Sequence, residues 1–206
     1  NKYAPTNAEI VNGSAWINAC EVLRDVEGIG LVVPVVGQSK DYNYGTGSST
    51  SINDQGVLAI FEVVQDHIHY QRVNNDQYMI AILGEDGTNS PSGTSYASKE
   101  GLRTHAEVLR ARYGGEFSQD TVLVSPSQFD RSLPTGNDTI KLGGQYMAAA
   151  IAGMIASRPV SSTLTRKFTS GFNNVLDIRT KADKINDSAS GLLVIEQKGR
   201  AIQVRH

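Results

Sequence analysis

The sequence of 206 residues contains one cysteine, Cys20. A single cysteine cannot form a disulfide within the chain, so a small secreted fold held together by disulfides is excluded. Cys20 lies at helical spacing from Trp16 and Leu23. We therefore interpret it as a small buried apolar residue rather than as a catalytic thiol.

An excess of charge of one sign is also lacking, because 19 lysines and arginines stand against 21 aspartates and glutamates. A protein that binds nucleic acid by neutralising phosphates normally has a basic excess, so we expect no direct contact with nucleic acid. Charged residues make up 19% of the chain, below the usual ~25%. Uncharged polar residues replace them, which hints at a surface that contacts other protein.

The sequence has no long apolar run. The longest covers residues 146–156, about half of the ~20 residues that a membrane-spanning helix needs, so we expect no membrane insertion. No signal peptide stands at the start, and Asn1 in place of Met suggests a processed chain or an excised fragment. Apolar residues, glycine included, reach about 45% of the chain, which is enough for a packed core.

The first half of the chain alternates between helix and strand patterns. Ser14 is a candidate cap for a helix that contains Trp16, Cys20 and Leu23, and residues 29–36 form an apolar run typical of a strand covered on both faces. Pro34 in that run favours its end or an edge position. Residues 53–71 predict a long amphipathic helix. Its apolar stripe consists of Val57, Ile60, Phe61, Val64 and Ile68.

The alternation then repeats. Residues 78–83 predict a second buried strand, and residues 121–124 predict a third, which ends at Pro126. A helix between them has Leu102, Ala106, Leu109 and Tyr113 on its inner face. We expect Arg103 and Glu107 to form an i, i+4 ion pair on its outer face. This order of elements predicts an α/β fold with a largely parallel sheet and helices on both faces.

The C-terminal part predicts two further helices and a hairpin. Residues 143–157 are apolar on all sides and rich in alanine, so we expect a helix buried in the protein. An irregular stretch and a short helix over residues 182–188 follow, and Gly191 ends that helix. Residues 192–196 and 201–204 flank a turn-like Lys198-Gly199 pair. That pattern indicates a C-terminal β-hairpin.

Ser95 is the first candidate for chemistry, because the string Gly93-Thr94-Ser95 looks like the nucleophile segment of a subtilisin-type protease. Such an enzyme also needs a histidine base and a buried aspartate. The histidine candidates are His67, His69 and His105. In that class the serine lies far downstream of the histidine and starts a buried helix, whereas Ser95 lies in a loop fewer than thirty residues after His67 and His69. We therefore favour a loop tip and helix cap over catalysis.

Two further motifs resemble ligand sites without completing one. His67 and His69 lie beside Asp66, but residues two apart on a helix point in nearly opposite directions, so we expect no metal site. Residues 45–50, GTGSST, stand between a strand and a helix as a phosphate-binding loop would. They lack the lysine of a P-loop and begin too far from the strand for a dinucleotide fingerprint, so we favour a connector.

Glu85 and Asp86 follow the second strand at its carboxyl end, which is where ligands bind in open parallel sheets. Adjacent carboxylates in a loop rich in Gly, Ser, Thr and Asn are more typical of a solvated turn, and we favour that interpretation. No nearby residue in the sequence completes an acid, base or nucleophile set. We thus expect no catalytic residue, no cofactor and no metal.

Residues 146–172 resemble the most recurrent stretch of the contractile tail sheath proteins of bacteriophages and related injection machines. The pattern is an alanine-rich helix ending in Ala152-Gly153, an A-x-x-P-V exit at residues 156–160, and Leu164-Thr165 before Arg166. VLVSPSQF at residues 122–129 and GLLVIEQKGRAIQVRH at residues 191–206 extend the similarity. It covers most of the chain in order.

The resemblance implies a subtilisin-like fold without protease chemistry. When GGQYMAAAIAG, residues 143–153, is placed against the protease pattern GTSMASPHVAG, Gln145 stands at the position of the nucleophile. A glutamine amide cannot be deprotonated to attack a carbonyl. The resemblance therefore implies a structural protein, and Gly93-Thr94-Ser95 is a coincidence of sequence.

The function that the resemblance implies is mechanical. Sheath subunits assemble in stacked rings around a tail tube and then contract, which drives the tube through the envelope of the host cell. The implied partners are other copies of the chain, the tube protein and the baseplate, and the implied location is the virion, after assembly in the host cytoplasm. Two alternatives remain open, a subtilisin-like hydrolase and a nucleotide-binding α/β module that uses residues 38–50.

We expect residues 1–206 to form one sheath-like α/β domain, a fragment without the N- and C-terminal assembly regions of a sheath subunit. In the family, the arms that link subunits lie in those regions. We therefore expect the chain alone to be a monomer or a weak oligomer.

Overall fold

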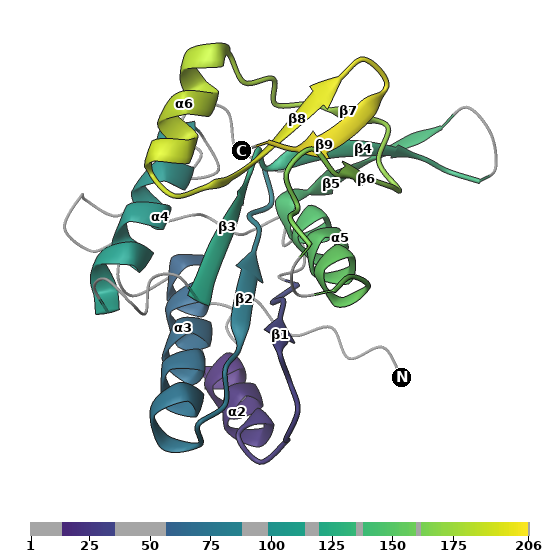
Figure 1. Ribbon diagram of the computed structural model, residues 1–206. Coiled ribbons are helices and arrows are strands. Elements are labelled where there is room, and N and C mark those ends of the chain that lie inside the picture. Colours follow the sequence, from purple (N-terminus) through teal and green to yellow (C-terminus); the bar gives the residue numbers. More distant parts are fainter. Residues whose placement is uncertain are drawn as a thin grey trace.

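The computed structural model describes residues 14–35, 57–87, 99–113, 120–134, 138–159 and 162–205 (Figure 1). Its helices are α2 (Ser14–Leu23), α3 (Val57–Asn74), α4 (Lys99–Tyr113), α5 (Gly144–Ala156) and α6 (Lys181–Ala189). Its strands are β1 (Leu31–Val32), β2 (Ile80–Leu83), β3 (Thr121–Ser125), β4 (Gln128–Ser132), β5 (Thr139–Gly143), β6 (Phe168–Thr169), β7 (Asn174–Val175), β8 (Leu193–Lys198) and β9 (Ala201–Val204).

Six strands form the main sheet, in the order β1-β2-β3-β8-β9-β6. The pairs β1–β2, β2–β3 and β3–β8 are parallel, whereas β9 is antiparallel to both β8 and β6. The predicted α/β fold with a largely parallel sheet is therefore confirmed. The predicted C-terminal hairpin is confirmed as well, with a turn in which Gly199 has a φ of 64°. Such a left-handed conformation favours glycine.

Helices cover both faces of the sheet (Figure 1). Alternate residues of a strand point to opposite faces, and accordingly Ala81 and Leu83 of β2 join one core while Ile82 joins the other. The first core lies under α2, α3 and α4 and contains Phe61. The second lies under α5 and contains Met147.

The predictions for α2, α3, α4 and α6 hold for the described residues. The stripe of α3 is fully buried, and so are Cys20 of α2 and Leu102 of α4. The helix α6 ends before Gly191, whose φ of 86° is again left-handed. The predicted start of α3 at residues 53–56 lies outside the described residues.

Two predictions about the elements are wrong, and one sheet was not predicted. The expected strand over residues 29–36 is only two residues long and half-buried rather than covered on both faces. The position that Pro34 favoured is confirmed, because β1 lies at the edge of the sheet and ends before Pro34. The helix α5 is buried on one face only, since Tyr146, Ala149 and Gly153 are exposed. An antiparallel sheet in the order β5-β4-β7 was not expected at all. Its strands β4 and β5 connect β3 to α5, and β7 follows α5 in the chain.

Candidate functional site

The structure separates the histidines that the sequence places close together. His67 is buried, and neither of its ring nitrogens has a hydrogen-bond partner among the residues that the structure describes. Burial, followed by the nearby Arg24 charge, lowers the pKa of His67. Asp66 lies on the exposed side of α3, where its carboxylate is 2.9 Å from Arg112 Nη2. Across the described ranges, no group of three His, Cys, Asp or Glu side chains is placed to hold a metal ion.

Two other candidates, Ser95 with its Gly93-Thr94-Ser95 string and the loop over residues 45–50, lie outside the described residues. Of the helices described, none is long and apolar enough to cross a membrane.

The carboxyl end of β2 carries a buried polar cluster. Glu85 is completely buried and Asp86 nearly so, which corrects the prediction of a solvated turn. Glu85 Oε1 lies 2.5 Å from Nδ1 of His105 on α4. Burial favours the neutral ring, but the charge and hydrogen bond of Glu85 outweigh it, so the pKa of His105 is raised. The two side chains form a buried acid–base pair that the sequence analysis missed.

Glycines bring the start of α5 against this cluster. The Gly144 N–H donates a 2.7 Å hydrogen bond to the Glu85 carbonyl oxygen. A Cβ atom at Gly84 would overlap the Gly144 backbone, and one at Gly144 would lie 2.8 Å from the Glu85 oxygen. Only residues without a side chain allow this approach of strand and helix.

Gln145 occupies the next position of α5. Its side chain is buried, and neither its oxygen nor its nitrogen has a hydrogen-bond partner among the described residues. The side-chain amide of Gln145 is not a nucleophile. The residue at this position of α5 therefore places no hydroxyl or thiol beside the Glu85–His105 pair. The chemistry that remains at the cluster is packing and charge pairing.

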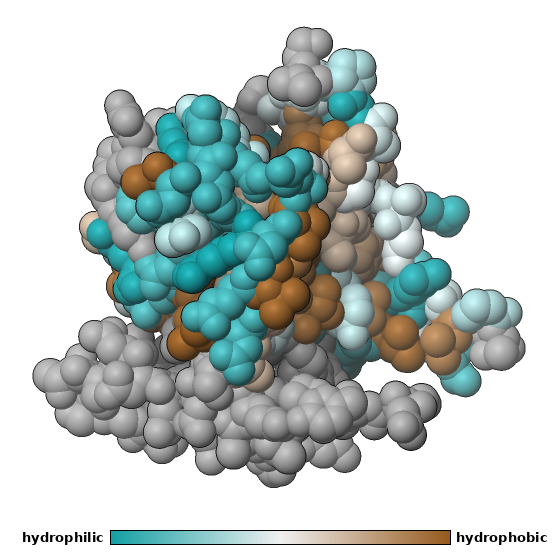
Figure 2. Space-filling model, turned by 90° about the horizontal axis from the view of Figure 1, so that it is seen from below, coloured by the Kyte–Doolittle hydropathy of each residue, from teal (hydrophilic) through white to brown (hydrophobic). Residues whose placement is uncertain are grey.

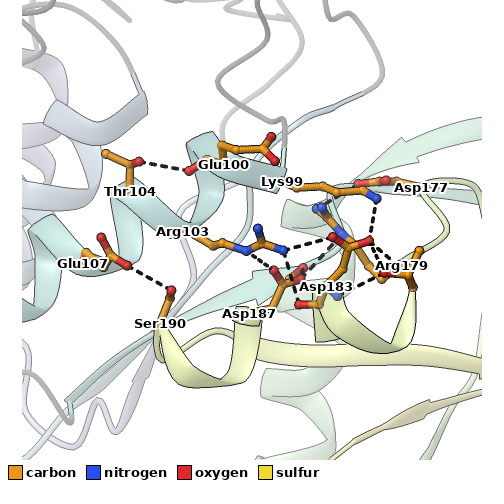
Figure 3. A network of polar contacts seen from close by, with 12 residues as sticks. Lys99, Glu100, Arg103, Thr104, Glu107, Asp177, Arg179, Asp183, Asp187 and Ser190 are labelled. Atoms are coloured by element: carbon orange, nitrogen blue, oxygen red, sulfur yellow. Dashed lines mark hydrogen bonds and ion pairs between the residues drawn. The ribbon is translucent and has the colours of Figure 1, made fainter. Parts of the chain in front are cut away.

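A second polar network joins α4 to α6 (Figure 3). Arg103 Nε lies 2.6 Å from Asp187, and Lys99 Nζ lies 2.6 Å from Asp183. The predicted pair between Arg103 and Glu107 is therefore wrong. Arg103 instead binds α6, and Glu107 accepts a hydrogen bond from Ser190.

Asp187 is the centre of this network. It is fully buried, accepts a 2.7 Å hydrogen bond from Ser125 at the end of β3, and lies near the buried Arg179. Hydrogen bonds from Lys99 and Thr180 hold the pKa of Asp183 well below its usual range. The network thus ties α4, α6 and β3 together. Since its members lie about 80 residues apart in the sequence, no local motif could have revealed it.

A basic pocket of about 490 Å³ lies between α6 and the β8–β9 hairpin. Its cationic residues are Arg166, Lys181, Lys184, Lys198 and Arg205. Its one carboxylate, Glu196, is bound by Lys184 and by Gln203. Although burial works in the opposite direction, these hydrogen bonds lower the pKa of Glu196, so it stays ionised. The pocket therefore has a clear excess of positive charge, which suits an anionic group.

Comparisons with known proteins place this fold among tail sheath proteins. The chain is 33% identical over 204 residues to the tail sheath protein of Mycobacterium phage Bxz1, a match that covers 96% of the chain and 32% of the phage protein. A scan against protein-family models gives no match.

Two solved structures have the same fold. The sheath tail protein of Desulfitobacterium hafniense matches 99% of the chain and 35% of its own length, with a TM-score of 0.57 at 14% identity. The sheath tail protein of Listeria innocua matches 99% of the chain and 34% of its own, with a TM-score of 0.56 at 12% identity. The chain spans about a third of the length of each of these proteins.

These relatives are structural proteins, not enzymes, which agrees with the glutamine at the start of α5. The resemblance carried by residues 146–172 is confirmed, and the identity extends over nearly the whole chain. The chain is a homologue of phage tail sheath proteins and corresponds to about a third of one.

Proposed function

We propose that this chain is part of a subunit of a contractile tail sheath. The subunit polymerises around the tail tube in stacked rings, and its contraction drives the tube through the envelope of the host cell. The observation that carries this proposal is the 33% identity to a phage tail sheath protein over 204 residues. The mature location is the virion, and assembly takes place in the cytoplasm of the host.

The packing of the chain supports a mechanical role. Contraction by repacking of contacts between subunits needs bodies that keep their shape while the contacts change. Cores on both faces of the sheet and the buried Asp187 network, which joins two helices and a strand, are features of such a body. No nucleotide or cofactor is required, since the energy is stored in the extended assembly.

We further propose that this chain forms one domain of the subunit and that the remaining two thirds supply the regions that link subunits. The length of the relatives supports this division, because the chain matches about a third of each. The tube protein and the baseplate are the partners of the complete subunit.

The proposal is tested by expressing the complete protein that contains this chain together with its tube protein. Negative-stain electron microscopy is expected to show tubes of a larger diameter than the tube protein forms alone, with a ring repeat along them. The tube protein without the sheath candidate is the control. If the mixture contains only bare tubes and unassembled protein, the sheath proposal is wrong.

A further inference from the structure

The two ends of the molecule carry opposite charge. The basic end is the pocket between α6 and the hairpin, where Arg166, Lys181 and Lys198 are exposed and form no side-chain hydrogen bond or ion pair with any described residue. Lys184 is bound to Glu196. The pocket thus has several cations available for a partner and no free carboxylate to neutralise them.

The acidic end lies at the amino ends of β1 and β2, beside α2. Its carboxylates are Glu21, Asp25, Glu27 and Asp76. All four are exposed, and none forms an ion pair with another residue in the part of the chain that is described. Of the nearby cations, Arg72 pairs with Asp120 and Arg24 lies over the Tyr70 ring, so the Arg24 charge stands against four carboxylates.

Both ends also expose large apolar side chains next to their charges. At the acidic end Val22 is 71% and Tyr78 is 69% exposed, and Figure 2, which views the molecule from this end, shows hydrophobic and hydrophilic side chains side by side. At the basic end Phe168 is 62% and Ile185 is 54% exposed. Protein interfaces combine an apolar centre with a polar rim, and both ends offer groups of both kinds.

The ends lie on opposite sides of the fold, since α2 is at the bottom of Figure 1 while α6 and the hairpin are at the top. The two ends of one molecule cannot touch each other. A contact between an acidic end and a basic end therefore requires two copies, arranged head to tail. Head-to-tail contacts between unlike surfaces generate rings or open helices, depending on the rotation from one copy to the next.

We propose that the acidic end of one copy docks on the basic end of the next copy, with its carboxylates in the pocket between α6 and the hairpin. This contact rests on the sheath function and deepens it, because it supplies a direct contact between copies within this domain. Its specificity comes from complementary charge, which favours this pairing over contacts between like ends.

The experiment uses charge reversal in the complete protein. One variant carries Lys181→Glu and Lys198→Glu, a second carries Asp25→Lys and Glu27→Lys, and a third combines all four changes. Asp138→Lys, an exposed charge reversal on β4–β5, is the matched control. Pelleting assays measure the protein concentration above which polymer forms. Each two-residue variant is expected to raise this concentration at least tenfold, and the four-residue variant and the control should lie near wild type.

Two results would overturn the contact while the sheath function stands. In one, both two-residue variants polymerise like wild type. In the other, the basic-end variant fails and the acidic-end variant does not, which would make the pocket a site for another acidic partner such as the tube.

If the wild-type protein forms no polymer, the sheath function fails, and the contact is then judged by sedimentation equilibrium at low salt. Self-association that each two-residue variant weakens and the four-residue variant restores would support it. A strictly monomeric protein would overturn it.

Discussion

The ion pair between Glu85 and His105 is a single contact whose contribution to folding stability depends on pH. Its atoms lie 2.5 Å apart in a buried site, and the pKa of His105 is raised above its ordinary value of 6.5. A histidine whose pKa is higher in the folded state contributes stability that is fully present below its unfolded pKa. This stability is lost as the pH rises through the folded value.

We predict that His105→Gln lowers the free energy of unfolding by about 2 kcal/mol at pH 6, because a buried carboxylate loses its charged partner. At pH 9 the difference from wild type should be smaller, since the stability that protonated His105 contributes declines as the pH rises through its folded pKa. Urea denaturation at both pH values measures this. A double variant with Glu85→Gln and His105→Gln is the control. An equal difference between wild type and His105→Gln at the two pH values would contradict the prediction.

A substitution at Gly84 tests whether β2 and α5 lie in close contact. A Cβ at this position would overlap the Gly144 carbonyl, which is backbone and cannot rotate away. We predict that Gly84→Ala destabilises the fold by roughly 3 kcal/mol or more, a cost typical of overpacking that displaces backbone.

The matched control for Gly84 is Gly153→Ala in α5. This glycine is exposed and has no atom within 4 Å of the position of a Cβ. Replacing this helical glycine by alanine is expected to raise the free energy of unfolding by about 1 kcal/mol. Thermal denaturation compares the two variants. If both glycines tolerate alanine equally, the two elements are not in close contact.

At the scale of the elements, Asp187 attaches α6 to α4 and to β3. This carboxylate is buried and is bound by Arg103 from α4 and by Ser125 from β3. We predict that Asp187→Ala lowers the free energy of unfolding by about 3 kcal/mol, because Arg103 and the buried Arg179 lose the buried carboxylate that they share and keep only Asp183 and Asp177 as partners. Hydrogen exchange should show faster exchange in α6 than in α3.

Ser188→Ala serves as the control for Asp187→Ala, since Ser188 lies on the exposed side of the same helix. This variant should leave the exchange of α6 unchanged. Protection of α6 that survives Asp187→Ala would mean that apolar packing, not the ion network, holds the helix.

Periodicity predicted α2, α3 and α4 well because each has a contiguous apolar stripe that packs in the core, as Phe61 and Leu102 do. It failed for α5, since alanine and glycine lose little by exposure and do not reveal which face is buried. It also missed β4, whose charged Asp130 pairs with Asn174 on β7, 44 residues away. Short polar strands that depend on distant partners carry no alternating pattern of their own.

At the scale of the whole molecule, local motifs were poor guides to function. The sequence drew attention to Glu85 and Asp86 through their place after a strand. Their burial depends on α4, which brings His105 from 20 residues away, and on the start of α5. The basic pocket collects cations from α6 and from segments around three strands. Such surfaces exist only once the chain has folded, whereas the sheath resemblance could be predicted because it is written in contiguous sequence.

A domain that moves as a rigid body during contraction should keep the hydrogen-exchange rates of its core amides unchanged. In the complete protein, assembled as a sheath, we predict that amides of β2, β3 and α5 exchange at the same rate in the extended and the contracted state. These elements lie in the cores, whose packing is not disturbed when contacts between subunits are exchanged. Amides near Asp25 and Lys198, which belong to the proposed contact, should exchange at different rates in the two states. Hydrogen exchange with mass spectrometry measures both. Altered exchange in β2 or β3 would instead mean that contraction deforms the domain itself.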